Sequence, residues 1–531
     1  MNPGVAASWQ SATVFFFQGF ATLCRDAATV QGFKARVLRR ILSPISPLVH
    51  PAAPPRAGQF RRLLIPWVAA DMNTSTTSVF AHISKGWIAL VCSAGLVGFA
   101  HGMFSASTFA SELASPDTPR FTIAWRDSGW WLVSPEGEPF FSKGVCLVTQ
   151  GASREEYDPE NPGYAAWQHY PSPHHWADAT LRRLKAWRFT TVGAWSDFAT
   201  LRQSGEQTLW LTPVLHIGST AGAPWWDMWD AAILERMDQV AREQILPLRD
   251  DPRVLGYYSD NELGWWNAAL WKMTLEQAPA SGQRQRLIQL LRDTYQNDWS
   301  KLREHFEPEK ANDWTSLEQG GMLYVRPGTD GFKVMRRFLG LMAERYYQLV
   351  HDLIRKYDRR ALILGDRYQS FYYPEVARAS ARWVDVSSSN LNASWSDGTY
   401  LRCYLDTLHR LTGKPILISE FYSAARENRS GNRNNSGVFP VVETQAERAR
   451  ALRTTLARLA GTPYVLGADW FQYFDEPRHG RDDGENFNFG LVDIHDRPYD
   501  PVTAAFARFD GTSAKSRPVR ARVDASAGVP P

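Results

Sequence analysis

Two carboxylates in this sequence stand where the chain leaves an apolar run. Glu262 ends the stretch "VLGYYSDNE", and Glu420 stands near the end of "PILISEF". A pair of carboxyl groups can hydrolyse a glycosidic bond, since one protonates the departing oxygen while the other attacks the anomeric carbon or activates water. A separation of about 5–5.5 Å predicts retention of configuration, and about 6.5–9.5 Å predicts inversion. We interpret Glu262 and Glu420 as the candidate catalytic pair.

The carboxyl group that acts as the acid must stay protonated near the working pH, so burial or its partner's charge has to raise its pKa. Trp265 and Trp266 follow Glu262 closely and can lower the polarity around it. Trp rings also stack on sugar rings. We expect Asp260 to support Glu262, and its charge can raise the pKa of that group. A surface carboxylate or a helix cap is the alternative for either glutamate taken alone.

Polar or aromatic residues end most of the other apolar runs as well. In a parallel barrel, active residues gather at these carboxyl ends of the strands. His216 is interpreted either as a ligand for a sugar hydroxyl or as a satisfied core histidine, and Arg367 either holds a carboxylate or hydroxyl or packs its stem over the strand ends. The candidate binding residues at these ends are Trp195, His216, Asn261, Arg367, Asn390, Trp470, Gln472 and Tyr473.

The elements that would position these residues alternate along 111–510. Eight apolar runs read as strands with both faces covered. They are 140–148, 189–195, 209–216, 254–262, 361–368, 383–390, 415–421 and 464–473. Helical patterns lie between them, at 174–187, 233–248, 335–358, 400–413 and 443–461.

This alternation predicts an α/β fold, a (β/α)8 TIM barrel, with a large insertion at roughly 265–330. A short β-hairpin at 121–148 precedes it, turning at Pro135-Glu136-Gly137. An open doubly wound sheet is the alternative, which is weakened because no Gly-rich phosphate loop follows the first strand. The aromatic cluster "PWWDMWD", 224–230, follows the third run; it is either a distal platform for sugar stacking or core packing under a loop.

The N-terminal part has the pattern of an export signal. At Lys85 a basic residue is followed by about eighteen mostly apolar residues and then small ones. Translation from Met72 would place this run near the start of the chain, so we interpret 1–71 as an upstream extension, disordered if made, and 72–110 as a signal peptide. The rival interpretations are an uncleaved membrane anchor and a buried helix. The predicted location is secreted or periplasmic, with a membrane anchor as the alternative.

Composition excludes several classes. Residues 1–110 and 511–531 carry net charges of +7 and +3, which leaves 111–510 at −6 in a chain of net charge +4. A mildly acidic body does not indicate a nucleic-acid partner. The four cysteines form no CxxC or Cys/His cluster, and we expect no metal and no organic cofactor. The tail 511–531 is predicted to be disordered.

Several stretches resemble a known family. Asn-Glu at 261–262 and Ser-Glu-Phe at 419–421 resemble the signature of the large clan of retaining glycosidases with (β/α)8 barrels. Within that clan, "GYYSDNELGW", "KPILISEFYSAA" and "GADWFQYFDEPRHGRDDGENFNFGLVDIHDRPY" are similar to the β-agarases of glycoside hydrolase family 50. The sequence departs from the family at Tyr422, where His is common. Only about 30 residues lie between the predicted signal and the first barrel run, where family members carry a sugar-binding β-sandwich.

The resemblance implies residue roles. Glu262 would be the general acid/base, Glu420 the nucleophile, Asn261 the group that holds the sugar 2-OH, and Trp470 the aromatic floor under the sugar. It also implies sugar contacts for Gln472, Tyr473, Asp475, Glu485, Asn486 and Asn488. From the residues alone, "DGENFNFG" also fits a turn-rich loop whose Asn and Asp side chains bond local backbone.

These observations predict a retaining, agarase-like glycoside hydrolase that acts on a β-linked galactan-type polysaccharide or oligosaccharide through two glutamates. Another clan enzyme, such as a β-galactosidase or mannanase, is one alternative. A non-catalytic sugar-binding barrel is the other. The expected partner is the carbohydrate alone.

Overall fold

The computed structural model describes residues 120–206, 209–391, 399–435 and 439–516. The upstream extension and the signal or anchor segment predicted for 1–110 lie outside these ranges. Among the helices that the ranges contain, none has both the length and the hydropathy of a bilayer-spanning segment.

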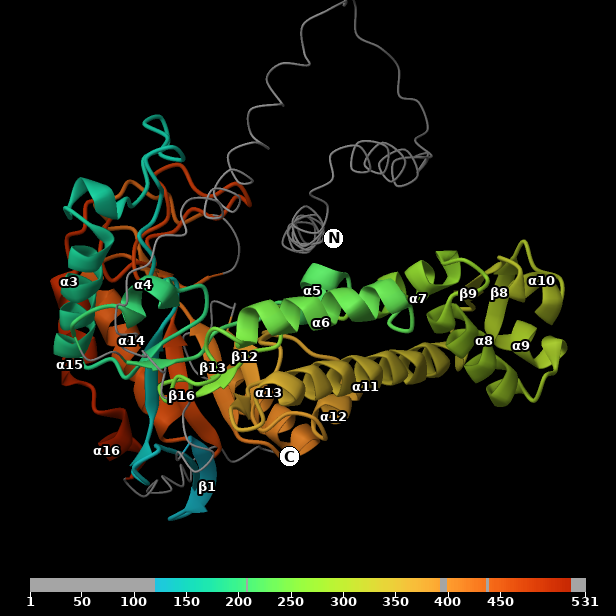
Figure 1. The fold of residues 1–531 in the computed structure, drawn as a ribbon. Helices are drawn as coiled ribbons and strands as arrows, with labels where there is room; N and C mark the ends of the chain where they lie inside the picture. The colour runs from blue at the N-terminus through green and yellow to red at the C-terminus, as the bar shows by residue number, and fades with distance from the viewer. Residues whose placement is uncertain (1–119, 207–208, 392–398, 436–438, 517–531) are drawn as a thin grey trace, which may run out of the picture. The chain divides into compact units, whose positions relative to one another are not determined.

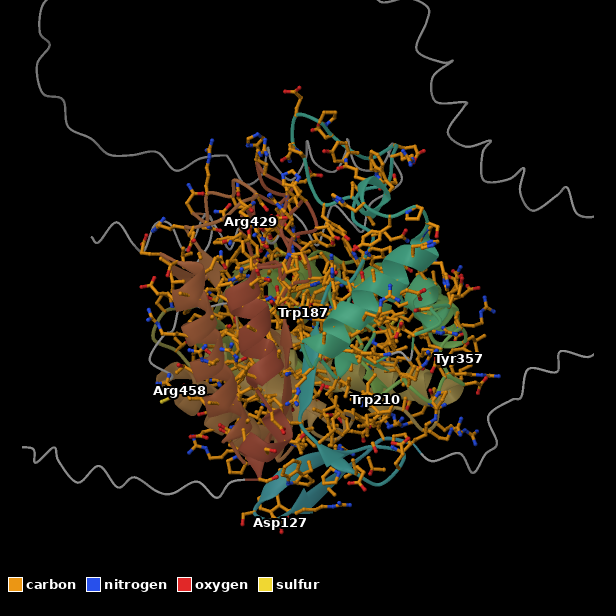
Figure 2. The ribbon with its side chains drawn as sticks, turned by 90° about the vertical axis from the view of Figure 1, so that its left-hand side faces the viewer. Asp127, Trp187, Trp210, Tyr357, Arg429 and Arg458 are labelled. Atoms are coloured by element: carbon orange, nitrogen blue, oxygen red, sulfur yellow. The ribbon has the colours of Figure 1, made fainter. Side chains whose placement is uncertain are left out.

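The described chain begins with a three-stranded antiparallel meander of β1 (Thr122–Arg126), β2 (Gly129–Val133) and β3 (Pro139–Phe140). Asp127 and Ser128 alone connect β1 to β2, with φ of 49° and 70°. Positive φ at both positions is what a two-residue type I′ turn requires. The predicted turn at Pro135-Glu136-Gly137 connects β2 to β3. The predicted hairpin is therefore part of a three-stranded meander, because β1 pairs with the other edge of β2. In Figure 2 the Asp127 turn lies at the bottom of the view and Arg429 near the top.

Each of the eight apolar runs contains a strand. These strands are β4 (Ser142–Val145), β5 (Thr191–Val192), β6 (Trp210–Leu211), β7 (Gly256–Tyr257), β10 (Leu362–Ile363), β12 (Ser387–Asn390), β13 (Ile416–Phe421) and β16 (Val465–Trp470). The strands β12, β13, β16, β4, β5 and β6 pair in that order, all parallel, and β11 (Tyr368–Gln369) pairs with β12.

The remaining two strands are also joined to this set. β7 pairs with β10 in parallel. Parallel bridges from Leu211 to Val254 and from Val214 to Tyr258 connect the β6 region to the β7 region. The backbone N–H of Val386, just before β12, donates to Ile363 of β10 at 3.1 Å. Each of the eight strands therefore has a backbone neighbour on both sides.

Both faces of these strands are buried, as their apolar sequences predict. On β13, Ile416 and Ile418 belong to a hydrophobic cluster shared with the helices, whereas Leu417 belongs to a second cluster. The second cluster also holds Tyr258 and Phe471. Since side chains alternate along a strand, the two clusters occupy opposite faces. The second cluster thus marks the face away from the helices.

All five predicted helical patterns form helices, with starts that follow capping chemistry. Ser172 caps α3 (Pro173–Ala186), with Pro173 in its first turn, and Thr444 and Glu447 form a capping box at the start of α14 (Gln445–Ala460). The other three are α6 (Ala231–Ile245), α11 (Gly331–Tyr357) and α13 (Thr399–Thr412). Shorter helices are α4 (Phe198–Arg202), α5 (Ile217–Ala221), α12 (Pro374–Ser380) and α15 (Asp500–Arg508), and η1 (Ala166–Gln168) is a 3₁₀ turn.

The predicted insertion is a mostly helical extension. It contains α7 (Asn267–Glu276), α8 (Gly282–Tyr295), α9 (Trp299–His305), β8 (Phe306–Glu309), α10 (Trp314–Glu318) and β9 (Met322–Val325). The long helix α11 leads back from it, and Figure 1 shows α6 and α11 side by side with α8, α9 and the β8–β9 hairpin beyond them. Trp271 stacks on Phe306 and meets Phe338 edge-on, and these rings belong to the hydrophobic cluster that the extension shares with the main core.

The C-terminal boundary differs from the predicted one. The expected disordered tail starts at 511, but Gly511–Lys515 forms helix α16. Asp510 caps this helix by accepting from the Ser513 N–H at 2.9 Å. The reason is local, because Asp followed by a short polar stretch is a helix-start signal. Residues 517–531 lie outside the described ranges.

Candidate active site

Four predicted site residues occupy an unusual backbone conformation at strand ends. Trp195, His216, Glu262 and Arg367 follow β5, β6, β7 and β10, with φ of 56°, 53°, 48° and 55°. Side chains other than glycine seldom adopt this left-handed region. Such residues persist where the surrounding structure holds them, and they gather at functional sites. The same sharp turn is thus made after four neighbouring strands.

The Glu262 carboxylate is held from the β12 strand. The Asn390 side-chain amide donates to Glu262 Oε1 at 2.7 Å and contacts Asn261 Oδ1 at 3.2 Å. The Glu262 backbone N–H lies 3.3 Å from the carbonyl oxygens of both Asp366 and Arg367. Glu262 is only partly buried, which leaves part of its side chain accessible.

Glu420 is the more buried of the two glutamates, with a side chain that is 4% exposed. The Arg367 guanidinium donates to Glu420 Oε1, and the Tyr422 hydroxyl donates to Glu420 Oε2. Both donors stabilise a negative carboxylate. Arg367 is itself fully buried and lies over the Trp195 ring, 4.3 Å from its centroid. The carboxylate of Glu420 is therefore held from two sides.

Asn390 also connects the two glutamates. In the parallel ladder between β12 and β13, Asn390 pairs with Glu420, and the Ser419 hydroxyl donates to Asn390 Oδ1 at 2.7 Å. The same side chain reaches Glu262 on its amide side. Both catalytic candidates therefore lie beside Asn390, although 158 positions separate them along the chain.

Electrostatics link the glutamates as well. Burial raises the pKa of Glu420 to about 8. The Arg367 charge opposes this rise, the charge of Glu262 adds to it, the Tyr422 hydroxyl opposes it, and Glu485 adds to it. The influence of Glu262 follows from like charge at short range. The two carboxylates are therefore close enough to influence each other electrostatically.

His216 lies beside this pair as a neutral imidazole. The Trp195 indole donates to His216 Nε2 at 3.1 Å, so the proton is assigned to Nδ1, which lies 3.5 Å from Ser219 Oγ. Burial lowers the pKa of His216, the Asp260 charge raises it, and the Arg367 charge lowers it further. His216 has protein partners, as the core-histidine alternative expects, and its contact with a sugar hydroxyl stays a prediction.

Asp260 is fully buried, and its carboxylate accepts hydrogen bonds from protein groups. It accepts from the N–H groups of Gly218 and Ser219, each at 2.8 Å, from Ser219 Oγ at 2.7 Å, and from the Tyr346 hydroxyl at 2.5 Å. Burial raises the pKa of Asp260, and its hydrogen-bond donors lower it. Asp260 therefore fixes the turn that begins at His216, and its expected effect on Glu262 stays a prediction.

Two predicted sugar contacts lie elsewhere. Trp470 is fully buried, donates to the Phe489 carbonyl at 2.9 Å and packs edge-on against Phe421 and Phe506 of α15. Tyr473 is fully buried too, with its hydroxyl 3.4 Å from Thr180 Oγ1 on α3. The role of aromatic floor for Trp470 and the sugar contact for Tyr473 are therefore wrong in this structure. Both side chains point to the helices.

The aromatic ring that does face the site is the next residue. Phe471 meets Trp195 edge-on at 6.1 Å and lies 5.3 Å from the Tyr422 ring. The alternation of side chains after β16 places positions 470 and 471 on opposite faces. Gln472 is buried, with its backbone N–H 3.4 Å from the Phe489 carbonyl.

The loop after β16 mostly braces itself. Asp475 accepts from the Ser430 and Tyr499 hydroxyls, at 2.6 and 2.7 Å. Asn486 Oδ1 accepts from Asn432 and from the Arg433 N–H, both at 3.1 Å. Asn488 Oδ1 accepts from the Ala425 N–H at 2.9 Å. These three side chains brace the loop against Tyr499 and residues 425–434, which are distant in sequence, rather than against the local backbone that the turn-rich alternative predicted.

Glu485 differs from Asp475, Asn486 and Asn488 because its charge and those of the catalytic candidates influence one another's pKa. Burial raises the pKa of Glu485, and the charge of Glu262 contributes to that rise. Arg481 approaches Glu485 at 3.4 Å and also approaches Glu476 at 3.7 Å. Glu485 therefore lies within electrostatic range of both Glu262 and Glu420.

Sequence reasoning missed three contributors. Tyr422 was noted only as a departure from the family, yet it donates to Glu420. Phe471 was overlooked beside Trp470. Asp469 on β16 is fully buried, and burial raises its pKa to about 7, against the Arg367 charge and the Tyr258 hydroxyl, which lower it. The one sequence signal for Asp469 was a charged residue inside an otherwise apolar strand.

Part of the aromatic cluster at 224–230 follows the core-packing alternative, and the sugar-stacking platform stays a prediction. Trp225 and Trp229 pack against the core, and the Arg345 guanidinium lies over the Trp229 ring. Trp226 is 37% exposed.

Within the part of the chain that the structure describes, no group of three or more His, Cys, Asp or Glu side chains is arranged to hold a metal ion.

Comparison with known proteins finds relatives among the beta-agarases. No known protein-family profile matches the chain. Beta-agarase B of Vibrio sp. (strain JT0107) is 26% identical over 366 residues, which cover 63% of this chain and 36% of that protein. Beta-agarase A of the same strain is 27% identical over 461 residues, which cover 72% of this chain and 44% of that protein. The chain thus matches less than half the length of either relative.

Solved structures show a similar fold. An exo-beta-agarase superimposes with a TM-score of 0.62 at 21% identity, covering 75% of this chain and 66% of the other. The agarase AgWH50C gives 0.62 at 21% identity, with 85% and 72% covered. PfGH50B gives 0.61 at 20% identity, with 75% and 67% covered. The chain therefore has a mixed α/β fold similar to that of agarases.

Proposed function

We propose that this chain is a retaining, agarase-like glycoside hydrolase that cleaves a β-linked galactan-type polysaccharide or oligosaccharide. The observation that carries the proposal is the position of Asn390, which pairs with Glu420 in the ladder and donates to Glu262 at 2.7 Å. Two glutamates beside one side chain, with different burial, supply the two roles that glycoside hydrolysis needs. The similarity to two Vibrio beta-agarases supports a galactan substrate.

The fold that we propose for this activity is a (β/α)8 barrel. The parallel pairings of the eight strands support it, together with the bridges at β6–β7 and the Val386–Ile363 bond at β10–β12, because they give every strand two neighbours. Helices follow most of the strands, and the candidate residues lie at the carboxyl ends, as in barrel enzymes. An open doubly wound sheet would leave two edge strands.

In the proposed mechanism Glu420 attacks the anomeric carbon and forms a glycosyl ester, while Glu262 gives its proton to the departing oxygen. Glu262 then takes a proton from water, the water oxygen bonds to the anomeric carbon, and Glu420 leaves as a carboxylate. The two donors on Glu420, Arg367 and Tyr422, favour its charged form as nucleophile. Partial exposure of Glu262 suits a group that must meet both the leaving oxygen and water.

The binding residues that we propose are those gathered at these strand ends. Asn261 and Asn390 would hold the sugar hydroxyl beside the nucleophile, and His216 and Trp195 would line the same side. Arg367 would act on Glu420 and Gln472 would line the site, whereas we no longer assign sugar contacts to Trp470 or Tyr473.

The test is a substrate panel of agarose, porphyran, other galactans, mannan and a chromogenic β-galactoside, with products identified. ¹H NMR of the first product decides the stereochemistry: the β-anomer appears first if the mechanism is retaining. Glu420→Gln should lower turnover by several orders of magnitude with folding intact. Normal turnover in that variant, or an α-anomer as first product, would contradict the mechanism. Cleavage of mannan or of β-galactoside alone would instead identify another clan activity.

We further propose that the enzyme is exported, with 72–110 as its signal. The support is the order of basic, apolar and small residues in that segment. N-terminal sequencing of the protein recovered outside the cytoplasm tests this: a start near 107–111 supports cleavage, and a start upstream of Lys85 supports a retained anchor.

A further inference from the structure

Two adjacent tryptophans behind Glu262 point in different directions. Trp265 is 2% exposed, donates to Asp366 Oδ2 at 3.1 Å and stacks on Tyr347. Trp266 is only partly buried, and its ring is nearly parallel to that of Phe371, at 13° with centroids 6.3 Å apart. Core packing accounts for Trp265. It does not account for Trp266.

Phe371 gives this pair of rings an exposed surface. It is 46% exposed, which is high for a large apolar side chain. Tyr373 meets it edge-on at 5.0 Å and so supports the ring from the protein side. At a centroid distance of 6.3 Å the parallel rings of Trp266 and Phe371 are offset rather than face to face. Together they offer an extended aromatic surface.

The backbone is adapted to this arrangement at Gly264. Its φ is +78°, and a Cβ at this position would lie 2.5 Å from Trp266 Nε1. A side chain there would displace the indole that stacks on Phe371. The glycine therefore serves the placement of Trp266 next to the surface.

Both rings lie on chain segments that also carry candidate site residues. Trp266 lies four residues after Glu262, and Phe371 lies four after Arg367. Ser370, next to Phe371, donates its N–H and its hydroxyl to the Asn390 carbonyl, each at 2.9 Å. The Asn390 amide in turn donates to Glu262. The rings are thus tied to Asn390, which contacts Glu262 through its amide and pairs with Glu420 in the ladder. Trp266 shares its chain segment with Glu262, the acid/base candidate.

We propose that Trp266 and Phe371 form a binding platform for a sugar ring on the leaving-group side of the cleaved bond. This inference rests on the proposed function, in which Glu262 protonates the departing oxygen. Pyranose rings present C–H faces that pack on aromatic faces, and an extended pair of rings suits a β-linked chain that continues beyond the cleavage point. The platform selects substrates with at least one sugar residue on that side.

The experiment measures binding separately from hydrolysis. Glu420→Gln, alone and combined with Trp266→Ala, is titrated with neoagarohexaose by calorimetry. The expected result is a Kd raised about tenfold by Trp266→Ala, which corresponds to about 1.4 kcal/mol, and a similar rise with Phe371→Ala. The matched control is Trp125→Ala in the Glu420→Gln background, because Trp125 is 56% exposed on β1 and meets Trp130 edge-on. Its Kd should equal that of Glu420→Gln alone. Circular dichroism melts check that each variant folds.

Kinetics in the active background give a second readout. Trp266→Ala should raise KM for agarose about tenfold with a smaller change in kcat. An unchanged Kd in Trp266→Ala and Phe371→Ala, or an equal loss in Trp125→Ala, would overturn the platform. Absence of hexaose binding in Glu420→Gln would overturn it as well. Failure of the proposed function is distinct, since it shows as full hydrolysis by Glu420→Gln whatever the binding data.

Discussion

The side-chain amide of Asn390 donates a 2.7 Å hydrogen bond to Glu262 Oε1. The same residue pairs with Glu420 across the ladder of β12 and β13. One asparagine thereby fixes the acid/base candidate relative to the strand that carries the nucleophile candidate. This relationship makes Asn390 a positioning residue whose removal should disturb catalysis more than folding.

Asn390→Ala should lower kcat/KM by about 10–100-fold, because a hydrogen bond to a charged group contributes about 1.5–3 kcal/mol. Steady-state kinetics on the substrate found in the panel measure the effect. Asn312→Ala is the control, since Asn312 is an exposed asparagine in the insertion. Equal kinetics for Asn390→Ala and the wild type would refute the positioning role.

Tyr422→Phe should move the acidic limb of the pH profile of kcat/KM to higher pH. Burial raises the pKa of Glu420 to about 8, and the Tyr422 hydroxyl counteracts that rise. Activity that requires ionised Glu420 therefore increases as pH rises through this value, and loss of the hydroxyl raises the pKa further. The variant should lose more activity at pH 6 than at pH 9.

Tyr324→Phe is the matched control for that profile. Tyr324 also donates to a glutamate, Glu309 at 2.8 Å, but on the surface of the insertion. Its pH profile should superimpose on that of the wild type. A shift of the Tyr422→Phe limb to lower pH would contradict the contact with Glu420.

Asp469→Asn should stabilise the protein at alkaline pH. The folded-state pKa of Asp469 is raised to about 7, so the folded protein keeps a proton that the unfolded chain releases above its ordinary value near 3.9. Stability from this group is present below the unfolded pKa and is lost as pH rises to about 7. The variant should gain about 1–3 kcal/mol at pH 8 and little at pH 4.

Urea unfolding at pH 4, 6 and 8 tests this dependence. Asp313→Asn serves as the comparison, because Asp313 caps α10 at the surface and its Ser316 contacts lower its pKa. That variant should show no gain at pH 8. A larger gain for Asp469→Asn at pH 4 than at pH 8 would reverse the sign and exclude an ionisation cost.

Trp470→Ala should cost stability and spare substrate affinity. Its side chain is fully buried between β16 and α15, and truncation of a buried Trp costs about 3–5 kcal/mol. Thermal and urea unfolding measure the loss, and KM of the protein that remains folded measures affinity. A raised KM with unchanged stability would restore the sugar-floor role that the sequence resemblance implied.

The order of the elements and the identity of the two glutamates could be predicted because they follow from local patterns. A short apolar run bounded by polar residues favours a strand buried on both faces, and a carboxylate that ends it lies at a strand end. The five helices followed from amphipathic periodicity and capping residues such as Ser172 and Thr444. These signals need no knowledge of distant residues.

Side-chain direction near the ends of the runs required the tertiary structure. The family resemblance implies a sugar floor at Trp470, yet strand register, fixed by the pairing of β16 with β4 and β13, turns Trp470 to the helices. Asn486 and Asn488 likewise bond residues 425–434, a segment that sequence separation hides.

The sequence by itself determined which residues can carry charge and which runs must be buried, since both depend on residue chemistry alone. The tertiary structure decided which of those residues meet. The left-handed turns at Glu262 and Arg367, and the contacts of Glu420 with Arg367 and Tyr422, depend on strands brought together by long-range pairing. Burial in that shared interior, rather than residue type, raises the pKa of Glu420.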